Sequence, residues 1–278
     1  MSLKKKYVYA CVIALSLLTT CKKETINPIT GINTTKISLI KISEAYAIGS
    51  ATKVELWSDS EISTGYQKFS VALYDSITEN PITRSIVEIL PMVSEKINNT
   101  IESSSVPFEN PQSFDATETL FKCASVFTKP TYGDLVQWNI IIRLKKIGQN
   151  QFTEVKMPIN VKQSVYERAK TIIASDGSKL IIAYIYPLIP SVGINNFGIC
   201  LYHMASPMTF EVDNSYSIYM TTEMPATKEI STNNANPFYD TNGLYRGRVD
   251  LTKNGIWRIN LNLNKNGKTV STFFEISL

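Results

Sequence analysis

Apolar and polar residues alternate along several short stretches of the chain. In 257–264, which reads WRINLNLN, every second residue from Trp257 onward is apolar and the residues between are polar. The stretch 138–145, WNIIIRLK, keeps apolar residues at the same alternate positions from Trp138. A period of two is that of a β-strand with one buried face. Clusters of Gly, Pro, Asn and Asp separate such stretches and no long helical period is present, so the pattern predicts an all-β protein.

The two halves of the chain contain matching stretches in the same order. GYQKFSVALYD at 65–75 matches GINNFGICLYH at 193–203, and IGSATKVEL at 48–56 matches DGSKLIIAY at 176–184. The two tryptophan stretches follow in the same order. We interpret the chain as a tandem duplication. It predicts two Ig-like β-sandwich domains of about seven strands each, at 37–161 and 170–278, joined by a linker at 162–169.

The N-terminus has the pattern of an export signal. Lys4, Lys5 and Lys6 precede an apolar stretch, Tyr7 to Leu18, which is too short to span a bilayer as a stable helix. This pattern predicts a secretory signal peptide at 1–20. The sequence LLTTC, ending at Cys21, resembles a lipobox, in which cleavage precedes a lipidated cysteine. An ordinary secreted protein and an uncleaved signal anchor are the alternatives.

A lipid on Cys21 would place the protein in the bacterial cell envelope. At about 0.8 kcal/mol per buried methylene, several acyl chains hold a protein on a membrane essentially permanently. The segment 21–36 is polar and contains a Pro and a Gly, so we expect a flexible tether. The expected location is the outer membrane, facing the periplasm or the cell surface.

Charge and cysteine content narrow the possible partners. The formal charge of +4 owes much to the N-terminal lysines, and no basic block indicates nucleic acid binding. Beyond the signal, no apolar run is long enough for a transmembrane helix.

Beyond the signal and Cys21, two cysteines remain: Cys123 and Cys200, one in each half. A disulfide between them would cross the domain boundary, so we expect two buried free thiols.

One short stretch holds several soft metal ligands. FGICLYHMASPM, at 197–208, contains the single histidine, His203, together with Met204 and Met208. Imidazole and thioether are ligands that suit copper. The repeat, however, sets His203 opposite Asp75, at the end of a strand. We therefore expect a strand-end histidine and no metal site, and Cu(I) titration should find no site tighter than micromolar.

Longer motifs resemble a known family. The stretches FSVALYD at 69–75, PFENP at 107–111 and LYRGRVDLTKNGIWRINL at 244–261 resemble the YtkA-like and FixH-like periplasmic domains. The resemblance covers 43–161 and 170–278 and is closest to the duplicated form found in bacterial lipoproteins. It implies a Met-rich, His-containing loop suited to copper. Here Met92 and Met224 remain, but Ser104 and Asn234 stand near the histidine positions, which implies that both loops are disabled.

Motifs for catalysis are missing from the sequence. A single histidine restricts any Ser-His-Asp triad, and there is no G-x-S-x-G elbow, phosphate-binding loop or C-x-x-C pair. A glycosidase carboxylate pair remains open, although nothing singles one out. The stretch NNANPFYDTNGLY, at 233–245, offers Phe238, Tyr239 and Tyr245 as candidates for binding a sugar or peptide.

Together these patterns predict a non-enzymatic, membrane-anchored lipoprotein without a cofactor. Its two Ig-like domains would have a binding or assembly role toward an unknown protein or glycan partner. A periplasmic copper-binding or copper-homeostasis protein and a carbohydrate-binding surface lipoprotein are the alternatives, and an unsuspected hydrolase is a third.

Overall fold

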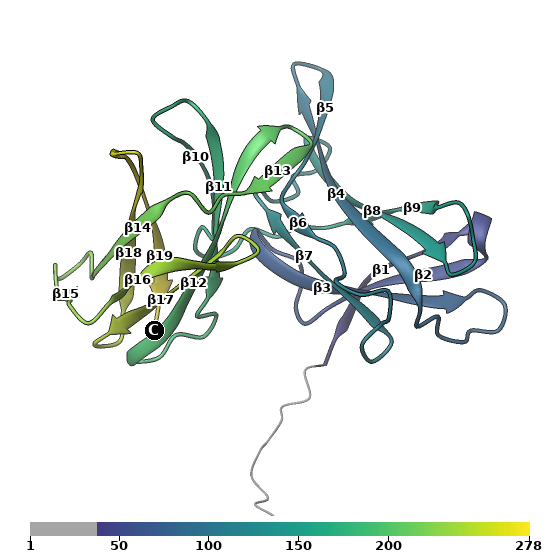
Figure 1. Ribbon diagram of the computed structural model, residues 1–278, viewed down its shortest axis with the longest axis horizontal. Helices are drawn as coiled ribbons and strands as arrows, with labels where there is room; N and C mark the ends of the chain where they lie inside the picture. The colour runs from purple at the N-terminus through teal and green to yellow at the C-terminus, as the bar shows by residue number, and fades with distance from the viewer. Residues whose placement is uncertain (1–37) are drawn as a thin grey trace, which may run out of the picture. The chain divides into compact units, whose positions relative to one another are not determined.

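The computed structural model describes residues 38–278, so the predicted signal peptide, Cys21 and the tether lie outside the described residues. The regular secondary structure of the described chain consists of β-strands, apart from a single 3-10 turn, η1 (Ile48–Ser50). The prediction of an all-β sandwich fold is confirmed (Figure 1).

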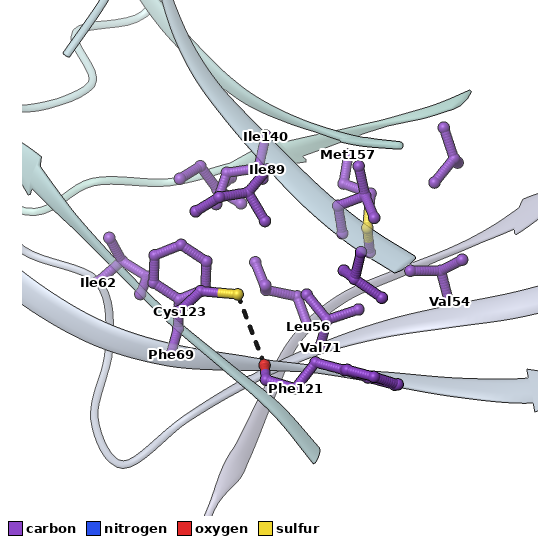
Figure 2. Packing of buried hydrophobic residues seen from close by; sticks show 14 of the residues in the cluster. Val54, Leu56, Ile62, Phe69, Val71, Ile89, Phe121, Cys123, Ile140 and Met157 are labelled. Atoms are coloured by element: carbon purple, nitrogen blue, oxygen red, sulfur yellow. Dashed lines mark hydrogen bonds between the residues drawn. The ribbon is translucent and has the colours of Figure 1, made fainter. Parts of the chain in front are cut away.

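The first half forms two antiparallel sheets around one core. One sheet has the order β1-β2-β3-β7-β6 and the other β5-β4-β8-β9. Apolar side chains from both sheets pack between them, and Figure 2 shows part of this core. The strands are β1 (Ile40–Ala47), β2 (Thr52–Ser58), β3 (Gly65–Asp75), β4 (Ser85–Ile97), β5 (Thr100–Ser105), β6 (Phe108–Glu109), β7 (Leu120–Phe127), β8 (Val136–Lys146) and β9 (Thr153–Ile159).

The second half repeats this arrangement around a core of its own. Its sheets have the orders β10-β11-β12-β17-β16 and β15-β14-β18-β19, and one extra strand, β13, pairs with β12. The strands are β10 (Ala169–Ile173), β11 (Lys179–Tyr186), β12 (Gly193–Ser206), β13 (Thr209–Val212), β14 (Ser217–Glu223), β15 (Ile230–Ser231), β16 (Ala235–Thr241), β17 (Leu244–Leu251), β18 (Ile256–Lys265) and β19 (Lys268–Ser277).

Strand pairing follows the same register in both halves. Val54 of β2 pairs with Leu73 of β3, and Ile182 of β11 pairs with Leu201 of β12. These are the residues that the sequence repeat sets opposite each other. A shift of one residue would turn every inward side chain outward, so an equal register means that equivalent positions face the same way in both halves.

A buried tryptophan anchors each core. The rings of Trp138 on β8 and Trp257 on β18 are almost fully buried. Each indole N–H donates to a backbone carbonyl, that of Lys129 at 3.1 Å and that of Lys253 at 2.9 Å. A buried indole therefore keeps its hydrogen bond while its ring fills the core.

A third apolar cluster joins the two halves. It contains Val126 of β7 and, from the second half, Ala169, Ile181, Ala183, Cys200 and Tyr202. These side chains lie on the outer face of the sheet that contains β11 and β12. Both faces of β11 are thus covered, which explains why its sequence, KLIIAYIY, is apolar nearly throughout instead of alternating.

The equivalent face of the first half carries charges. The register sets Lys53 and Glu55 at the positions of Ile181 and Ala183. Lys53 Nζ lies 2.8 Å from Glu55 Oε1, and Lys41 Nζ lies 2.6 Å from Glu44 Oε2. The outer face of β11 is therefore apolar, whereas the equivalent positions of β2 are occupied by ion pairs, beside the part of the same sheet where Val126 packs in the shared cluster.

The segment expected to be a linker is hydrogen-bonded to the first half. Lys162 N donates to Ile62 O at 2.8 Å, Thr64 N donates to Lys162 O at 2.9 Å, and Ser164 N donates to Thr64 Oγ1 at 3.0 Å. Gly65, at φ 116°, lies against Arg168, and an added Cβ would come within 2.7 Å of Arg168 Cβ. Only glycine fits both this backbone conformation and this contact.

The shared cluster leads to a stability prediction. Ile181→Lys places a charge among apolar side chains, so we expect the free energy of unfolding to fall by about 3 kcal/mol or more. The matched control, Lys53→Ile, changes the equivalent position of β2, where Lys41 Nζ remains 3.4 Å from Glu55 Oε1, and should change stability by only about 1 kcal/mol. Urea denaturation followed by far-UV circular dichroism measures both. Equal effects of the two changes would contradict the assignment of the covered face.

Candidate functional site

The residues of the sulfur-rich stretch do not converge. His203 and Met204 are consecutive in β12, so their side chains point to opposite faces of the sheet. His203 pairs with Leu180 and Glu211, whereas Met204 pairs with Phe210. Met208 lies beyond, in the turn between β12 and β13. Within 38–278, no group of three His, Cys, Asp or Glu side chains is arranged to hold a metal ion.

The two methionines of the family-like loops have structural positions. Met92 lies inside β4, where it pairs with Ser105 and Asn139, so the segment expected to be a loop in the first half is a β-hairpin of β4 and β5. The apolar residues before Met92 continue the strand instead of ending it. Met224 is buried in the second core, and its Cε would lie 2.6 Å from a Cβ added to Gly255.

The positions near the family's histidine are also occupied by structural contacts. Ser104 pairs with Val93 in the hairpin. The amide of Asn234 donates to Thr222 Oγ1 and to Ser231 O, each at 2.9 Å, and its oxygen accepts from Asp250 N at 3.0 Å. Asn234 therefore ties β14, β15 and β17 together.

Both described cysteines are free thiols in buried positions. Cys123 belongs to the first core, where Sγ donates to Phe121 O at 3.5 Å (Figure 2). Cys200 belongs to the cluster that joins the halves. Burial raises the pKa of both thiols well above the usual range, which keeps them protonated and unreactive at neutral pH.

The three candidate aromatic residues lie at different depths. Tyr245 is fully buried in the second core, and its hydroxyl donates to Asp213 O at 2.9 Å. Burial raises the pKa of Tyr245 to about 12. The ring of Tyr239 packs edge to face against that of Tyr245, with centroids 5.6 Å apart. Phe238 is the most exposed of the three, and 65% of its surface is accessible.

Phe238 belongs to a row of side chains that crosses the outer face of the second half. Tyr186 of β11 pairs with Gly198 of β12, Gly198 pairs with Arg246 of β17, and Arg246 pairs with Phe238 of β16. Residues directly opposite each other in antiparallel strands present their side chains on the same face. We call these four residues the aromatic–arginine row.

The glycine in this row makes room for the tyrosine ring. A Cβ on Gly198 would lie 2.3 Å from Cζ of Tyr186, so the ring rests directly on the glycine backbone. Burial raises the pKa of Tyr186 and keeps its hydroxyl protonated. The Arg246 guanidinium, at the next position, forms an ion pair with Asp240 at 2.5 Å. Packing on Gly198 therefore positions the Tyr186 ring, and the ion pair with Asp240 positions the Arg246 side chain.

A surface pocket of about 440 Å³ opens beside the row, and Tyr186, Asn196 and Arg246 are among its lining residues. Asn195 fixes the neighbouring loop: its amide nitrogen donates to Ser191 O at 2.7 Å and its oxygen accepts from Ser191 N at 2.9 Å. The walls of the pocket are thus formed by paired strands and a tied loop.

An apolar loop borders this pocket. Pro187 lines the pocket and begins the loop between β11 and β12. The stretch 187–198 contains no charged residue, and 92% of Ile189 is accessible. Leu188, Val192 and Ile194 are also exposed. The equivalent loop of the first half, DSEIST at 59–64, is acidic and buries its Ile62. The fold therefore does not require apolar residues to be exposed here.

The row and the loop combine aromatic, arginine and aliphatic side chains on one surface. Aromatic residues and arginine are enriched at the centres of protein interfaces, where they contribute most of the binding energy. The sequence analysis singled out Phe238 but not Tyr186 or Arg246. A signal was available, because the apolar run through β11 continues past the strand into the loop.

Comparison with known proteins identifies no family. No family model and no curated protein match the chain. Domains 5 and 6 of the S-layer protein SbsC share 16% identity, with 86% of this chain and 99% of that chain covered, at a TM-score of 0.28. A tandem of titin Ig domains shares 10% identity, covering 78% of this chain and 90% of that chain, at a TM-score of 0.19. Such TM-scores do not establish a shared fold, so the fold rests on the sheets described above.

The prediction that the protein has no tight Cu(I) site is tested by titration. Titration of the purified protein should show no site tighter than micromolar, because His203 and Met204 face opposite sides of β12. His203→Ala should leave the titration curve unchanged. The sequence placed His203 at a strand end, whereas it lies inside β12, paired on both sides. A tight site that disappears in this variant would establish a copper site and overturn the interpretation of His203 as a structural residue.

Proposed function

We propose that the chain is a non-enzymatic, lipid-anchored protein of the bacterial envelope that binds a protein partner. The binding surface would be the aromatic–arginine row together with the apolar loop beside it. The observation that carries this proposal is the row itself, in which an exposed phenylalanine, an arginine and a tyrosine side chain line one face of a single sheet.

The chemistry of the surface favours a protein over a glycan. The aliphatic side chains of Leu188, Ile189 and Val192 offer no hydrogen-bonding groups to a sugar, but they gain free energy when another apolar surface covers them. The charge of Arg246 is partly balanced by Asp240. Carbohydrate binding at this surface is the second proposed function, since Asn196 and Tyr186 line the same pocket.

The anchor would come from the N-terminal segment, which lies outside the described residues. A lipid on Cys21 followed by a tether at 21–36 would let the folded part stand up to roughly 55 Å from the membrane. With that reach, the folded part could contact a neighbouring protein of the envelope. No helix among the described residues is long and apolar enough to span a bilayer. Membership of the YtkA-like family stays a prediction.

The lipid anchor is tested by changing its attachment site. In Triton X-114 phase separation the wild-type protein should enter the detergent phase, and Cys21→Ser should remain in the aqueous phase or keep its uncleaved signal. Mass spectrometry of the wild-type N-terminus should show a diacylglyceryl cysteine. An unmodified Cys21 in a membrane-bound protein would indicate a signal anchor, and a released protein would indicate ordinary secretion.

The binding surface is tested by crosslinking in cells. A photo-crosslinking amino acid at position 189 should give a defined protein adduct, whereas the same group at position 77, an exposed turn of the first half, should not. With the purified partner, Arg246→Ala and Phe238→Ala should each weaken binding about tenfold. Tyr132→Ala, an exposed aromatic residue of the first half, is the matched control.

Two results would argue against this proposal. An adduct that forms equally at positions 77 and 189 would show that the apolar loop is not a specific contact. Binding of a glycan that is lost in Arg246→Ala, with no protein adduct, would assign the row to carbohydrate instead.

A further inference from the structure

The other sheet of the second half has an outer face of a different character. Inward residues of β18, such as Ile259 and Leu261, are fully buried, so Asn260 and Asn262 between them face outward. On the neighbouring strands Tyr219 pairs with Asn262, Thr221 pairs with Asn260, and Ser271 pairs with Asn262. These five residues, which carry hydroxyl and amide groups and no charge, are called the amide face. At the next outward position of the same three strands, Arg258 forms ion pairs with Glu223 and Glu275.

The equivalent face of the first half is closed by ion pairs. The pairing of β4 with β8 sets Glu88 and Arg143 at the positions of Tyr219 and Asn262. Arg143 Nη1 lies 2.7 Å from Glu88 Oε2, and Arg143 Nε lies 3.0 Å from Glu154 Oε1. The same sheet position is thus compatible with charged residues. The uncharged amides of the second half are not demanded by the fold.

A hollow of about 470 Å³ lies on this face. Tyr219, Thr221, Ser231, Asn236 and Asn260 are among its lining residues. The ring of Tyr219 is 57% accessible and forms an open flat surface beside the hollow. An aromatic side chain, amide groups and hydroxyl groups therefore line one concave surface, which is the general form of a small-ligand site.

One buried group in this hollow lacks a partner. Ser231 is only 8% accessible, and its hydroxyl has no hydrogen-bond partner within the described residues. Leaving a buried hydroxyl unpaired is costly, and such a group in a folded protein calls for an explanation. Ser231 pairs with Thr222, which is buried on the core side of β14, so this hydroxyl faces the core side of the sheet and is not among the groups of the amide face.

The polar groups of the face are not all equally available. Asn262 accepts a hydrogen bond from Ser271 Oγ at 2.6 Å, and Asn236 accepts one from Met220 N at 2.9 Å. The amide of Asn260 forms no hydrogen bond with another residue of 38–278. Asn260 can thus offer one acceptor and two donors to a ligand.

From these observations we infer that the amide face binds a neutral carbohydrate. Sugar hydroxyls both donate and accept, which matches the amide of Asn260 and the hydroxyl of Thr221. The apolar C–H face of a pyranose ring fits the exposed ring of Tyr219. An anionic ligand is disfavoured because Glu223 lines the hollow and Arg258, opposite it in the strand register, is already paired with Glu275 at 2.8 Å.

This site is separate from the proposed protein-binding surface. The amide face lies on the sheet β15-β14-β18-β19, whereas the aromatic–arginine row lies on the sheet that contains β11, β12, β17 and β16. The two proposals can therefore succeed or fail independently. Together they would make the second half a connector between a glycan and a protein of the envelope.

The test uses the full-length Cys21→Ser protein, which keeps every residue of both surfaces. It is first applied to an array of neutral and acidic oligosaccharides, and bound neutral oligosaccharides are then titrated by calorimetry. We expect at least one neutral oligosaccharide to bind. Tyr219→Ala and Asn260→Ile, the latter taking the residue found at the equivalent position 141, should each weaken binding at least tenfold. Tyr219→Phe keeps the ring and should bind within threefold of the parent protein.

Controls separate this site from the others. Asn139→Ala changes an outward asparagine of the first half, and Arg246→Ala changes the aromatic–arginine row; neither should alter sugar binding. Far-UV circular dichroism checks the fold of each variant. The inference is overturned if no neutral oligosaccharide binds at millimolar concentration, if only acidic ones bind, or if Asn260→Ile binds as the parent protein does. Loss of binding in Arg246→Ala alone would also overturn it, because the sugar would then lie on the other sheet.

Discussion

Both halves of the protein depend on the burial of every second residue along one strand, counted from its tryptophan. Trp138 on β8 and Trp257 on β18 fill the two cores, and the backbone carbonyls of Lys129 and Lys253 satisfy their indole N–H groups. Because the side-chain period of a strand is two, fixing the inward residues also fixes which residues face outward. The outward positions are then free to differ between the halves, and their differences carry the functional information.

Three outer surfaces lose ion pairs or acidic residues in the second half, although Arg258, paired with Glu275, stands where the first half has Asn139. Ion pairs on the outer face of β2 are replaced by apolar residues on β11, charges on β8 are replaced by amides on β18, and an acidic loop at 59–64 is replaced by an aliphatic one at 187–192. The first of these changes is explained within the molecule, because the first half covers β11. The other two surfaces have no covering partner among the described residues. They are therefore where a ligand or partner would account for the lost charge.

The sequence could reveal what depends on local alternation. The apolar positions around Trp257 and the all-β class follow from alternation within ten residues or so, and the matching of Leu73 with Leu201 follows from the repeated order of segments in the two halves. The sequence analysis did not predict that the first half covers the outer face of β11, because the period of a strand does not show what packs against each of its faces. The family resemblance placed Met92 in a loop, whereas the structure places it inside β4, so the resemblance was misleading at this position. The aromatic–arginine row joins four strands from 186 to 246, and such long-range pairing is not contained in any one segment.

The charge difference between the halves also explains why binding would concentrate in the second. An ion pair such as Lys53–Glu55 already satisfies its own charges, and covering it with a partner costs the hydration of both groups. Each outer face of the first half carries such pairs, so docking there begins with a penalty. The aliphatic loop of the second half has no such penalty and gains about 25 cal/mol for each Å² of apolar surface covered. The amide face exchanges water for ligand hydroxyls at little cost. The apolar loop and the amide positions of the second half thus lack the ion pairs and acidic residues found at the equivalent positions of the first half.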